Sequence, residues 1–281
     1  MMKKILYILL SGFITLVSCE DVIDVDVPTA ATRLVIEASL DWEKGTAGNE
    51  QSIELRLSTP YFDTTSNSDV IGASVTVENL DSGETFVFDD MNDGSYTTSS
   101  FVPVIGDTYE LTVVYQGETY AATEVMTPVV EISNITQSVE GGFDDELLEV
   151  NIYFNDPADE ENYYLIKYQR EGDQFAELGD RSDEFFNGNE IHDFYEKQDD
   201  PDNGEYPLVP GDMVAIDLYG ISEAYYNYIR ILIEQSSSQG DPFSSLAAQV
   251  KGNCINETQP ANYAFGYFRV TEVDKRSYTV E

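Results

Sequence analysis

Residues 74–98 read SVTVENLDSGETFVFDDMNDGSYTT, and this stretch decides the fold class. Valine alternates with polar residues in its first part, and phenylalanine does so in its second part. Alternation with a period of two is typical of β-strands that bury one face. The strand-like parts are separated by Asp-Ser-Gly at 81–83 and Asn-Asp-Gly at 92–94, which favour tight turns. The stretch therefore predicts consecutive antiparallel strands.

The same pattern extends outward from this stretch over residues 33–128. We predict seven short strands there, at residues 34–40, 53–58, 74–78, 85–88, 95–98, 109–115 and 119–126. Short strands at this spacing, separated by turns that carry Gly or Asp, are typical of an immunoglobulin-like (Ig-like) antiparallel β-sandwich. We expect residues 33–128 to form such a sandwich, which ends at Thr127-Pro128 because proline terminates strands.

Residues 129–281 are expected to form a larger, β-rich second domain with one packed helix. Its predicted strands lie at residues 129–139, 148–154, 163–170, 213–219, 263–272 and 277–280. The helix is predicted from Ser222 to about Gly240, because apolar side chains recur there at helical spacing. Residues 172–207 lack clear periodicity and predict a long loop or insertion. The fold class expected for the whole chain is all-β.

The composition is strongly acidic. The chain has 53 Asp and Glu against 14 Lys and Arg, a formal net charge of −39, while 42% of its residues are hydrophobic. That apolar content is too high for a disordered acidic segment. The charge repels phosphates, so we expect no nucleic-acid partner. Residues 140–205 alone contain 22 acidic residues and four basic ones, which predicts a highly acidic surface in the second domain.

The N-terminus has the features of a lipoprotein export signal. Residues 1–18 combine two lysines with an apolar run at 5–17, which is too short to span a bilayer about 30 Å thick. Leu16-Val17-Ser18-Cys19 resembles a bacterial lipobox, so Cys19 is the predicted lipidation site and residues 1–18 the cleaved signal peptide. Residues 19–32 are expected to form an acidic tether. The expected location is the outer membrane, lipid-anchored and facing the cell surface.

Several fragments together resemble a Bacteroidota outer-membrane lipoprotein family known as a domain of unknown function, number 4249. The fragments that carry the resemblance are Asp24-Val25-Asp26-Val27-Pro28, Arg33-Leu34-Val35-Ile36-Glu37, Gly94-Ser95-Tyr96, Gly106-Asp107-Thr108-Tyr109-Glu110-Leu111, Pro242-Phe243-Ser244-Ser245, Gly252-Asn253, Asn256-Glu257-Thr258 and Ala264-Phe265-Gly266-Tyr267-Phe268. Members are typically encoded beside a TonB-dependent receptor. The resemblance therefore implies an accessory subunit of a TonB-dependent outer-membrane transporter, with such a β-barrel as its partner. It implies no catalytic residues.

The residues give little support to catalysis, and we expect the protein not to be an enzyme. His192 is the only histidine, and no Gly-x-Ser-x-Gly segment supplies a nucleophile for it. We predict a solvated loop histidine with no catalytic role. A pair of catalytic carboxylates, as in glycosidases, stays open because it needs only two well-placed acids among many.

No resident cofactor or metal is predicted. Two acidic turns, Asp199–Glu205 and Asp156–Glu161, leave weak calcium binding open, although neither has the ligand spacing of an EF-hand loop. Acylation of Cys19 would leave Cys254 as a lone thiol, and a lone cysteine is usually a small buried hydrophobe.

Tyrosine-rich segments offer the best candidate for a ligand or partner contact. On the predicted helix, Tyr225 and Tyr228 share the apolar stripe, whereas Tyr226 points away from it. Tyr226 is therefore the predicted exposed contact, because exposed tyrosines are frequent in binding sites. The leading hypothesis is the transporter accessory subunit. The alternatives are a glycan-binding or glycan-active surface lipoprotein and a structural envelope module.

Overall fold

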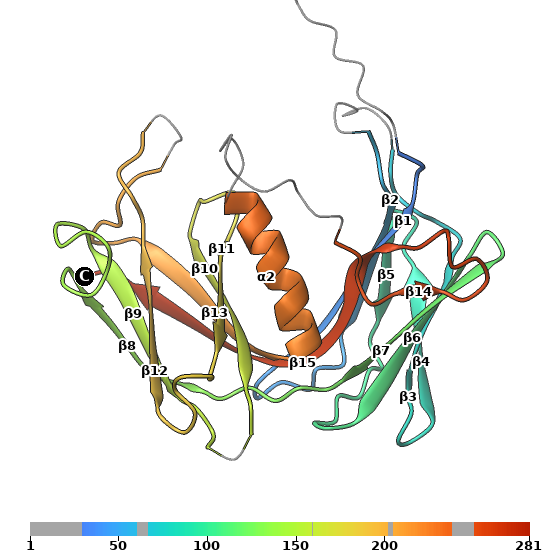
Figure 1. Ribbon diagram of the computed structural model, residues 1–281, viewed down its shortest axis with the longest axis horizontal. Helices are drawn as coiled ribbons and strands as arrows, with labels where there is room; N and C mark the ends of the chain where they lie inside the picture. Colours follow the sequence, from blue (N-terminus) through green and yellow to red (C-terminus); the bar gives the residue numbers. More distant parts are fainter. Residues whose placement is uncertain (1–29, 61–66, 159, 202–204, 238–249) are drawn as a thin grey trace, which may run out of the picture. The chain divides into compact units, whose positions relative to one another are not determined.

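The computed structural model describes residues 30–60, 67–158, 160–201, 205–237 and 250–281. Contacts divide the chain into two compact units, residues 1–31 and 32–281. The predicted signal peptide, Cys19 and most of the predicted tether lie outside the described residues. The fold below is that of the second unit (Figure 1).

All seven strands predicted before residue 128 are present, so the Ig-like sandwich is confirmed. They are β1 (Leu34–Glu43), β2 (Gln51–Leu57), β3 (Ser74–Asn79), β4 (Glu84–Asp90), β5 (Ser95–Thr98), β6 (Thr108–Tyr115) and β7 (Glu118–Val125). Strand β4 pairs with both β3 and β5, so that it links a β1-β2-β5 layer to a β3-β6-β7 layer. The alternating apolar residues of both layers, such as Val77, Phe86 and Tyr96, are buried in one core.

The second half of the chain is also mainly β. Its strands are β8 (Ile132–Ser138), β9 (Glu149–Asn155), β10 (Tyr163–Arg170), β11 (Glu177–Ser182), β12 (Glu190–Glu196), β13 (Met213–Ile221), β14 (Ile255–Asn256) and β15 (Phe265–Thr279). Strands β12-β9-β8 form a three-stranded sheet, and the other strands belong to a twelve-stranded sheet ordered β11-β10-β13-β15-β1-β2-β5-β4-β3-β6-β7-β14. A second core contains residues from β9, β10, β12 and β13, including Ile152, Ile166 and Ile216. The all-β class is confirmed.

Strand β15 connects the two halves. Its first part runs parallel to β1, with Val35 beside Phe265 and Glu43 beside Val273, and its second part runs antiparallel to β13. The prediction of two separate terminal strands is wrong, because the charged run around Asp274 continues the strand. The Asp274 carboxylate is buried, where it accepts a hydrogen bond from the backbone N–H of Ile132 at 2.8 Å. The predicted domain limits at 33–128 and 129–281 stay predictions.

The predicted loop at 172–207 contains two strands, β11 and β12, so this prediction is wrong. Strand β11 is half-exposed at the sheet edge and therefore has no apolar alternation. In β12, the buried position between Ile191 and Tyr195 is occupied by Asp193. This charged residue interrupts the alternation of apolar and polar residues by which a strand is recognised in the sequence. Asp193 is tolerated there because it accepts a hydrogen bond from the Tyr168 hydroxyl at 3.1 Å and pairs with Arg181 at 2.5 Å.

Cys254 is buried, as predicted, in the core of the first sandwich. Burial raises the pKa of the Cys254 thiol to about 12, because the interior disfavours the thiolate. The thiolate is the reactive form of cysteine, so burial and the raised pKa both favour a packing role for Cys254.

Candidate functional site

The candidate site lies where the helix α2 (Glu223–Ser237) leaves strand β13. Ser222 caps the helix, since its hydroxyl accepts a hydrogen bond from the backbone N–H of Tyr225 at 3.2 Å. Glu223 in the first turn is favourable beside the positive end of the helix dipole. One face of α2 packs Tyr225 and Ile229 against a small core that includes Tyr219 and Tyr267. The capped first turn and the packed face of α2 together determine where the side chain of Tyr226 lies.

Tyr226 lies in a surface pocket with a volume of about 400 Å³, formed by β10, the β11–β12 loop and α2. Its ring packs against that of Tyr163, with the centroids 5.0 Å apart and the planes at 42°. A second pocket of about 550 Å³ shares Tyr163, Glu161 and Glu223 with the first. The two hollows are therefore adjacent, and we call them together the Tyr163–Tyr226 pocket.

The walls of this pocket are acidic. They include Glu161, Asp183, Glu184 and Glu223, with one positive side chain, Arg230, among the residues that line the hollow. Burial and the charges of Glu223 and Glu161 raise the pKa of Tyr163, so its hydroxyl stays protonated and can donate a hydrogen bond. The pocket thus offers two aromatic rings, many hydrogen-bond acceptors and a negative potential. It suits a cationic or polyhydroxylated ligand and repels an anionic one.

A buried arginine, Arg269, contacts helix α2 and the strands on which it packs. Arg269 is 2% exposed, and its Nη2 atom donates to Asp41 Oδ1 at 2.6 Å. Its guanidinium carbon lies 4.8 Å from the centroids of both Tyr219 and Tyr225, at cation–π distance. Burial works against the charge, but Asp41 and the two tyrosines outweigh it and raise the pKa of Arg269. The arginine, on β15, therefore joins β1, β13 and α2 through these contacts.

The predicted contact Tyr226 is half-buried, because Tyr163 covers one side of its ring. Its role as a contact stays a prediction. Tyr225 is buried, as the helical spacing indicates. Sequence reasoning missed Tyr163 as the partner of Tyr226, because the two residues meet only through the packing of α2 on β10. The adjacent Tyr163-Tyr164 pair was a weak signal for it.

His192 is on strand β12, so the prediction of a loop histidine is wrong. Its side chain is exposed, stacks on Tyr153 with centroids 4.8 Å apart, and hydrogen-bonds through Nε2 to Asn151 Oδ1 at 2.6 Å. Tyr153 lies directly opposite on β9, so the pair is a cross-strand contact.

The described part of the two acidic turns gives no cluster of metal ligands. Asp156 is buried and accepts hydrogen bonds from the Tyr164 hydroxyl at 2.6 Å and the Gly188 N–H at 3.0 Å, so it is a structural residue. Residues 159 and 202–204 lie outside the described residues. In the described ranges, no three His, Cys, Asp or Glu side chains come together as metal ligands would. The described helix is too short and too polar to cross a membrane.

Comparison with solved structures finds distant β-sandwich proteins. The FN1–FN3 domains of chicken CNTN1 share 12% identity, cover 70% of this chain and 63% of theirs, and give a TM-score of 0.25. A DUF4785 family protein from Legionella pneumophila shares 12% identity over 68% of this chain and 53% of its own, with a TM-score of 0.26. A two-domain fibronectin type-III segment of chicken tenascin shares 13% identity over 61% of this chain and 85% of its own, with a TM-score of 0.22. The chain thus spans less than two thirds of the first two proteins.

The likeness to these proteins is remote, and the strand pairing itself shows the all-β fold. No curated protein matches the sequence. One family model does, over residues 20–277, which is nearly the whole chain beyond the predicted signal peptide. The protein therefore belongs to the family defined by the domain of unknown function DUF4249.

Proposed function

We propose that the protein is a lipid-anchored, surface-exposed accessory subunit of a TonB-dependent outer-membrane transporter. In this role it binds a ligand in the Tyr163–Tyr226 pocket and presents it to the barrel. The observation that carries the binding role is the pocket itself, with its two adjacent hollows and its tyrosine pair. The proposal that a barrel is the partner rests on the family resemblance and on the lipobox-like segment that ends at Cys19.

The anchor and the charge agree with this role. Residues 20–33 separate Cys19 from β1 and can span at most about 50 Å. The body is therefore confined near the membrane, while its net negative charge is repelled by anionic head groups. An anchored protein that does not adhere to lipid is free to contact a neighbouring membrane protein.

The anchor is tested with Cys19→Ala. We expect the wild-type protein to incorporate labelled palmitate, to fractionate with the outer membrane and to co-purify in detergent with a large β-barrel protein. Cys19→Ala should lose the label and the membrane fractionation, because the acyl chains provide the anchoring energy. Cys254→Ala is the matched control and should keep both, since its thiol is buried. Repeated recovery of the wild-type protein without a barrel would refute the transporter role.

The pocket is tested with Tyr226→Ala in a thermal-shift screen. The probes are polyamines and neutral oligosaccharides, which represent the cationic and polyhydroxylated classes that suit the acidic walls. At least one probe should raise the melting temperature of the wild-type protein, as a ligand that binds only the folded state must. Tyr226→Ala should lose this shift, whereas Tyr153→Ala, a half-buried tyrosine on β9 of the three-stranded sheet, should keep it. An equal shift in all three proteins would show that the ligand binds elsewhere.

A further inference from the structure

The three-stranded sheet and the β10 and β13 strands of the long sheet pack around the second core, and we call this part of the fold the second β-sandwich. Three loops meet at one of its ends. Ser138 at the end of β8, Glu149 at the start of β9 and Glu196 at the end of β12 are aligned across the three-stranded sheet. In the facing sheet, the end of β10 at Arg170 is aligned with the start of β13 at Val214. The loops that follow these strand ends are therefore neighbours. We call their described residues, 139–148, 171–176, 197–201 and 205–212, the loop end.

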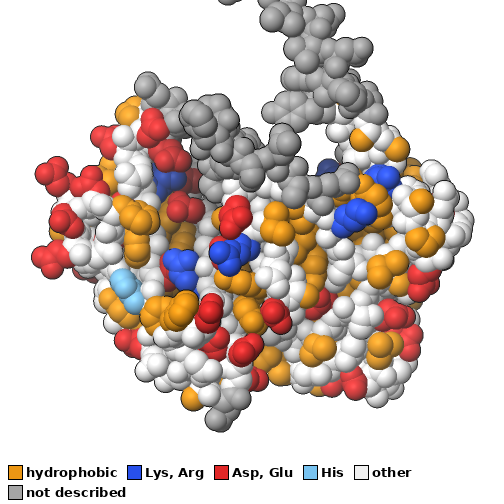
Figure 2. All heavy atoms as spheres, in the orientation of Figure 1, with side chains coloured by type: hydrophobic (Ala, Val, Ile, Leu, Met, Phe, Trp, Pro, Cys, Tyr) orange, Lys and Arg blue, Asp and Glu red, His pale blue; other side chains and the backbone are white. Residues whose placement is uncertain are grey.

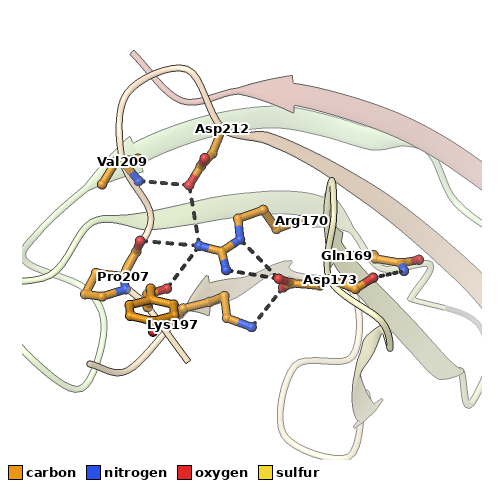
Figure 3. Close-up of polar contacts among 8 residues, drawn as sticks. Gln169, Arg170, Asp173, Lys197, Pro207, Val209 and Asp212 are labelled. Carbon is orange, nitrogen blue, oxygen red and sulfur yellow. Dashed lines mark hydrogen bonds and ion pairs between the residues drawn. The ribbon is translucent and has the colours of Figure 1, made fainter. Parts of the chain in front are cut away.

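A charged cluster ties the loops of the loop end together (Figure 3). Arg170 Nη2 donates to Asp173 Oδ1 at 3.0 Å, and Lys197 Nζ donates to Asp173 Oδ2 at 2.9 Å. Arg170 Nη1 also donates to the Tyr206 carbonyl at 3.1 Å and lies 3.6 Å from Asp212 Oδ2. Burial would raise the pKa of Asp173, but the bonds from Lys197 and Arg170 hold it below its usual value. The β10–β11 loop, which contains Asp173, is thus tied to the β12–β13 loop, which contains Lys197, Tyr206 and Asp212.

The β8–β9 loop is fixed by two buried carboxylates. Glu149 Oε1 accepts hydrogen bonds from the Ser138 hydroxyl and from the Gly141 N–H, the latter at 2.7 Å. Glu196 Oε2 accepts from the Phe143 N–H at 2.9 Å. A Cβ at Gly142 would collide with carboxylate oxygens of both Glu149 and Glu196, so a side chain there would displace these carboxylates from the loop. These hydrogen bonds hold the loop over the two carboxylates, while the Phe143 ring lies at the surface with one edge against the Phe194 ring, 5.1 Å between centroids.

The loop end exposes large apolar side chains on this fixed frame. Phe143 is 86% exposed, Phe175 is 77% exposed, and Tyr206 and Val209 are each 53% exposed. Each of the three loops contributes at least one of them. Aromatic side chains that are held on rigid loops at the end of a sandwich are typical of recognition surfaces, because little entropy is lost when they are buried by a partner.

The apolar tips are surrounded by negative charge. The described residues of the loop end carry four acids in the β8–β9 loop, two in the β10–β11 loop and four in the β12–β13 loop, against one basic residue, Lys197. Lys197 is itself paired with Asp173. Figure 2 shows acidic side chains gathered on the side of the molecule where β8 and β9 lie in Figure 1.

We infer that the loop end is a docking surface for a protein whose facing side combines apolar pockets with lysine and arginine side chains. Charge complementarity selects this occupant, since a second copy of the loop end, an anionic lipid surface and a nucleic acid would all be repelled. The inference rests on the proposed function in one respect: the partner with this chemistry is the outer-membrane barrel.

The experiment compares two phenylalanines at opposite ends of the same sandwich. Phe175 is on the loop end, whereas Phe185 is 82% exposed on the β11–β12 loop at the other end. We expect Phe175→Ser, and more strongly Phe143→Ser with Phe175→Ser, to reduce the co-purified barrel at least tenfold from detergent extracts of whole cells. Phe185→Ser should leave the yield of barrel unchanged. Circular dichroism and the melting temperature of each variant confirm that exposed substitutions leave the fold intact.

The outcomes separate this inference from the proposed function. If the wild-type protein recovers no barrel, the transporter role fails. If it recovers the barrel and the loop-end variants recover as much, the transporter role stands and the docking surface lies elsewhere. A photo-crosslinking residue at position 175 should join the barrel at an extracellular segment rich in Lys and Arg, and the same residue at 185 should not. Cross-links to an acidic segment or to glycan would overturn the inference, as would an association that resists high salt.

Discussion

Substitution of Arg269 by alanine should lower the melting temperature more than any other single side-chain truncation beneath α2. Removal of one partner of a buried ion pair typically costs about 3–5 kcal/mol. Arg269 is enclosed and lies against the rings of Tyr219 and Tyr225, while its partner Asp41 is partly exposed, so its removal leaves a cavity and takes the salt bridge from Asp41. For a protein of this size, we expect a decrease of about 6–20 °C, measured by differential scanning calorimetry.

Two further variants serve as controls for the melting temperature of Arg269→Ala. Arg269→Met keeps most of the side-chain volume, so it should recover part of the lost stability if the cavity matters. Arg230→Ala removes an arginine from an exposed pair with Glu234 on the surface of α2, and it should leave the melting temperature unchanged within error. If Arg269→Ala melts within 2 °C of the wild-type protein, on the order of one small contact, then Arg269 does not hold the helix and the sheet together.

Gly266→Ala should prevent the chain from reaching a stable fold. Gly266 has a φ of +88°, and a side chain in this conformation costs about 1–3 kcal/mol by itself. A Cβ there would also collide with the carbonyl of Ile36, which lies on the neighbouring strand β1. The parallel pairing of β1 with β15 would have to separate. We expect insoluble expression, or a urea midpoint far below that of the wild-type protein.

Gly106→Ala is the control that separates the cost of the backbone conformation from the cost of the collision with Ile36. Gly106 has a nearly equal φ of +84°, but a Cβ there meets no atom within 4 Å. This variant therefore reports the conformational cost alone and should be folded and only modestly destabilised. Equal urea midpoints for the two variants would show that the contact with Ile36 is not what requires glycine at position 266.

The strands were predictable wherever one face is buried and the other faces solvent. Val75 and Val77 in β3 and Phe86 and Phe88 in β4 display this alternation directly, so the first sandwich follows from local pattern. Prediction failed where a buried position is polar. Asp193 in β12 is stabilised by Tyr168 and Arg181, which are distant in sequence, so no local signal marks it as buried.

The candidate site was predictable only in part, for the same reason. Helical spacing identifies Tyr226 as lying off the apolar stripe, because that property depends on the sequence of α2 alone. The ring that completes the pocket comes from Tyr163 on β10, and its contact with Tyr226 depends on how the helix packs. The cluster of Arg170, Asp173 and Lys197 likewise joins separate loops, and nothing in the neighbourhood of each residue indicates the others.

The pairing of β1 with β15 sets an order in time for folding. The residues that cover one edge of β1 lie at positions 265–273, more than 220 residues later in the chain. That edge stays open until nearly the entire polypeptide has been synthesised, so the long sheet cannot close while the chain is growing. Pairing between segments this far apart in sequence forms slowly, so we expect the closure of the long sheet to be a late step of folding.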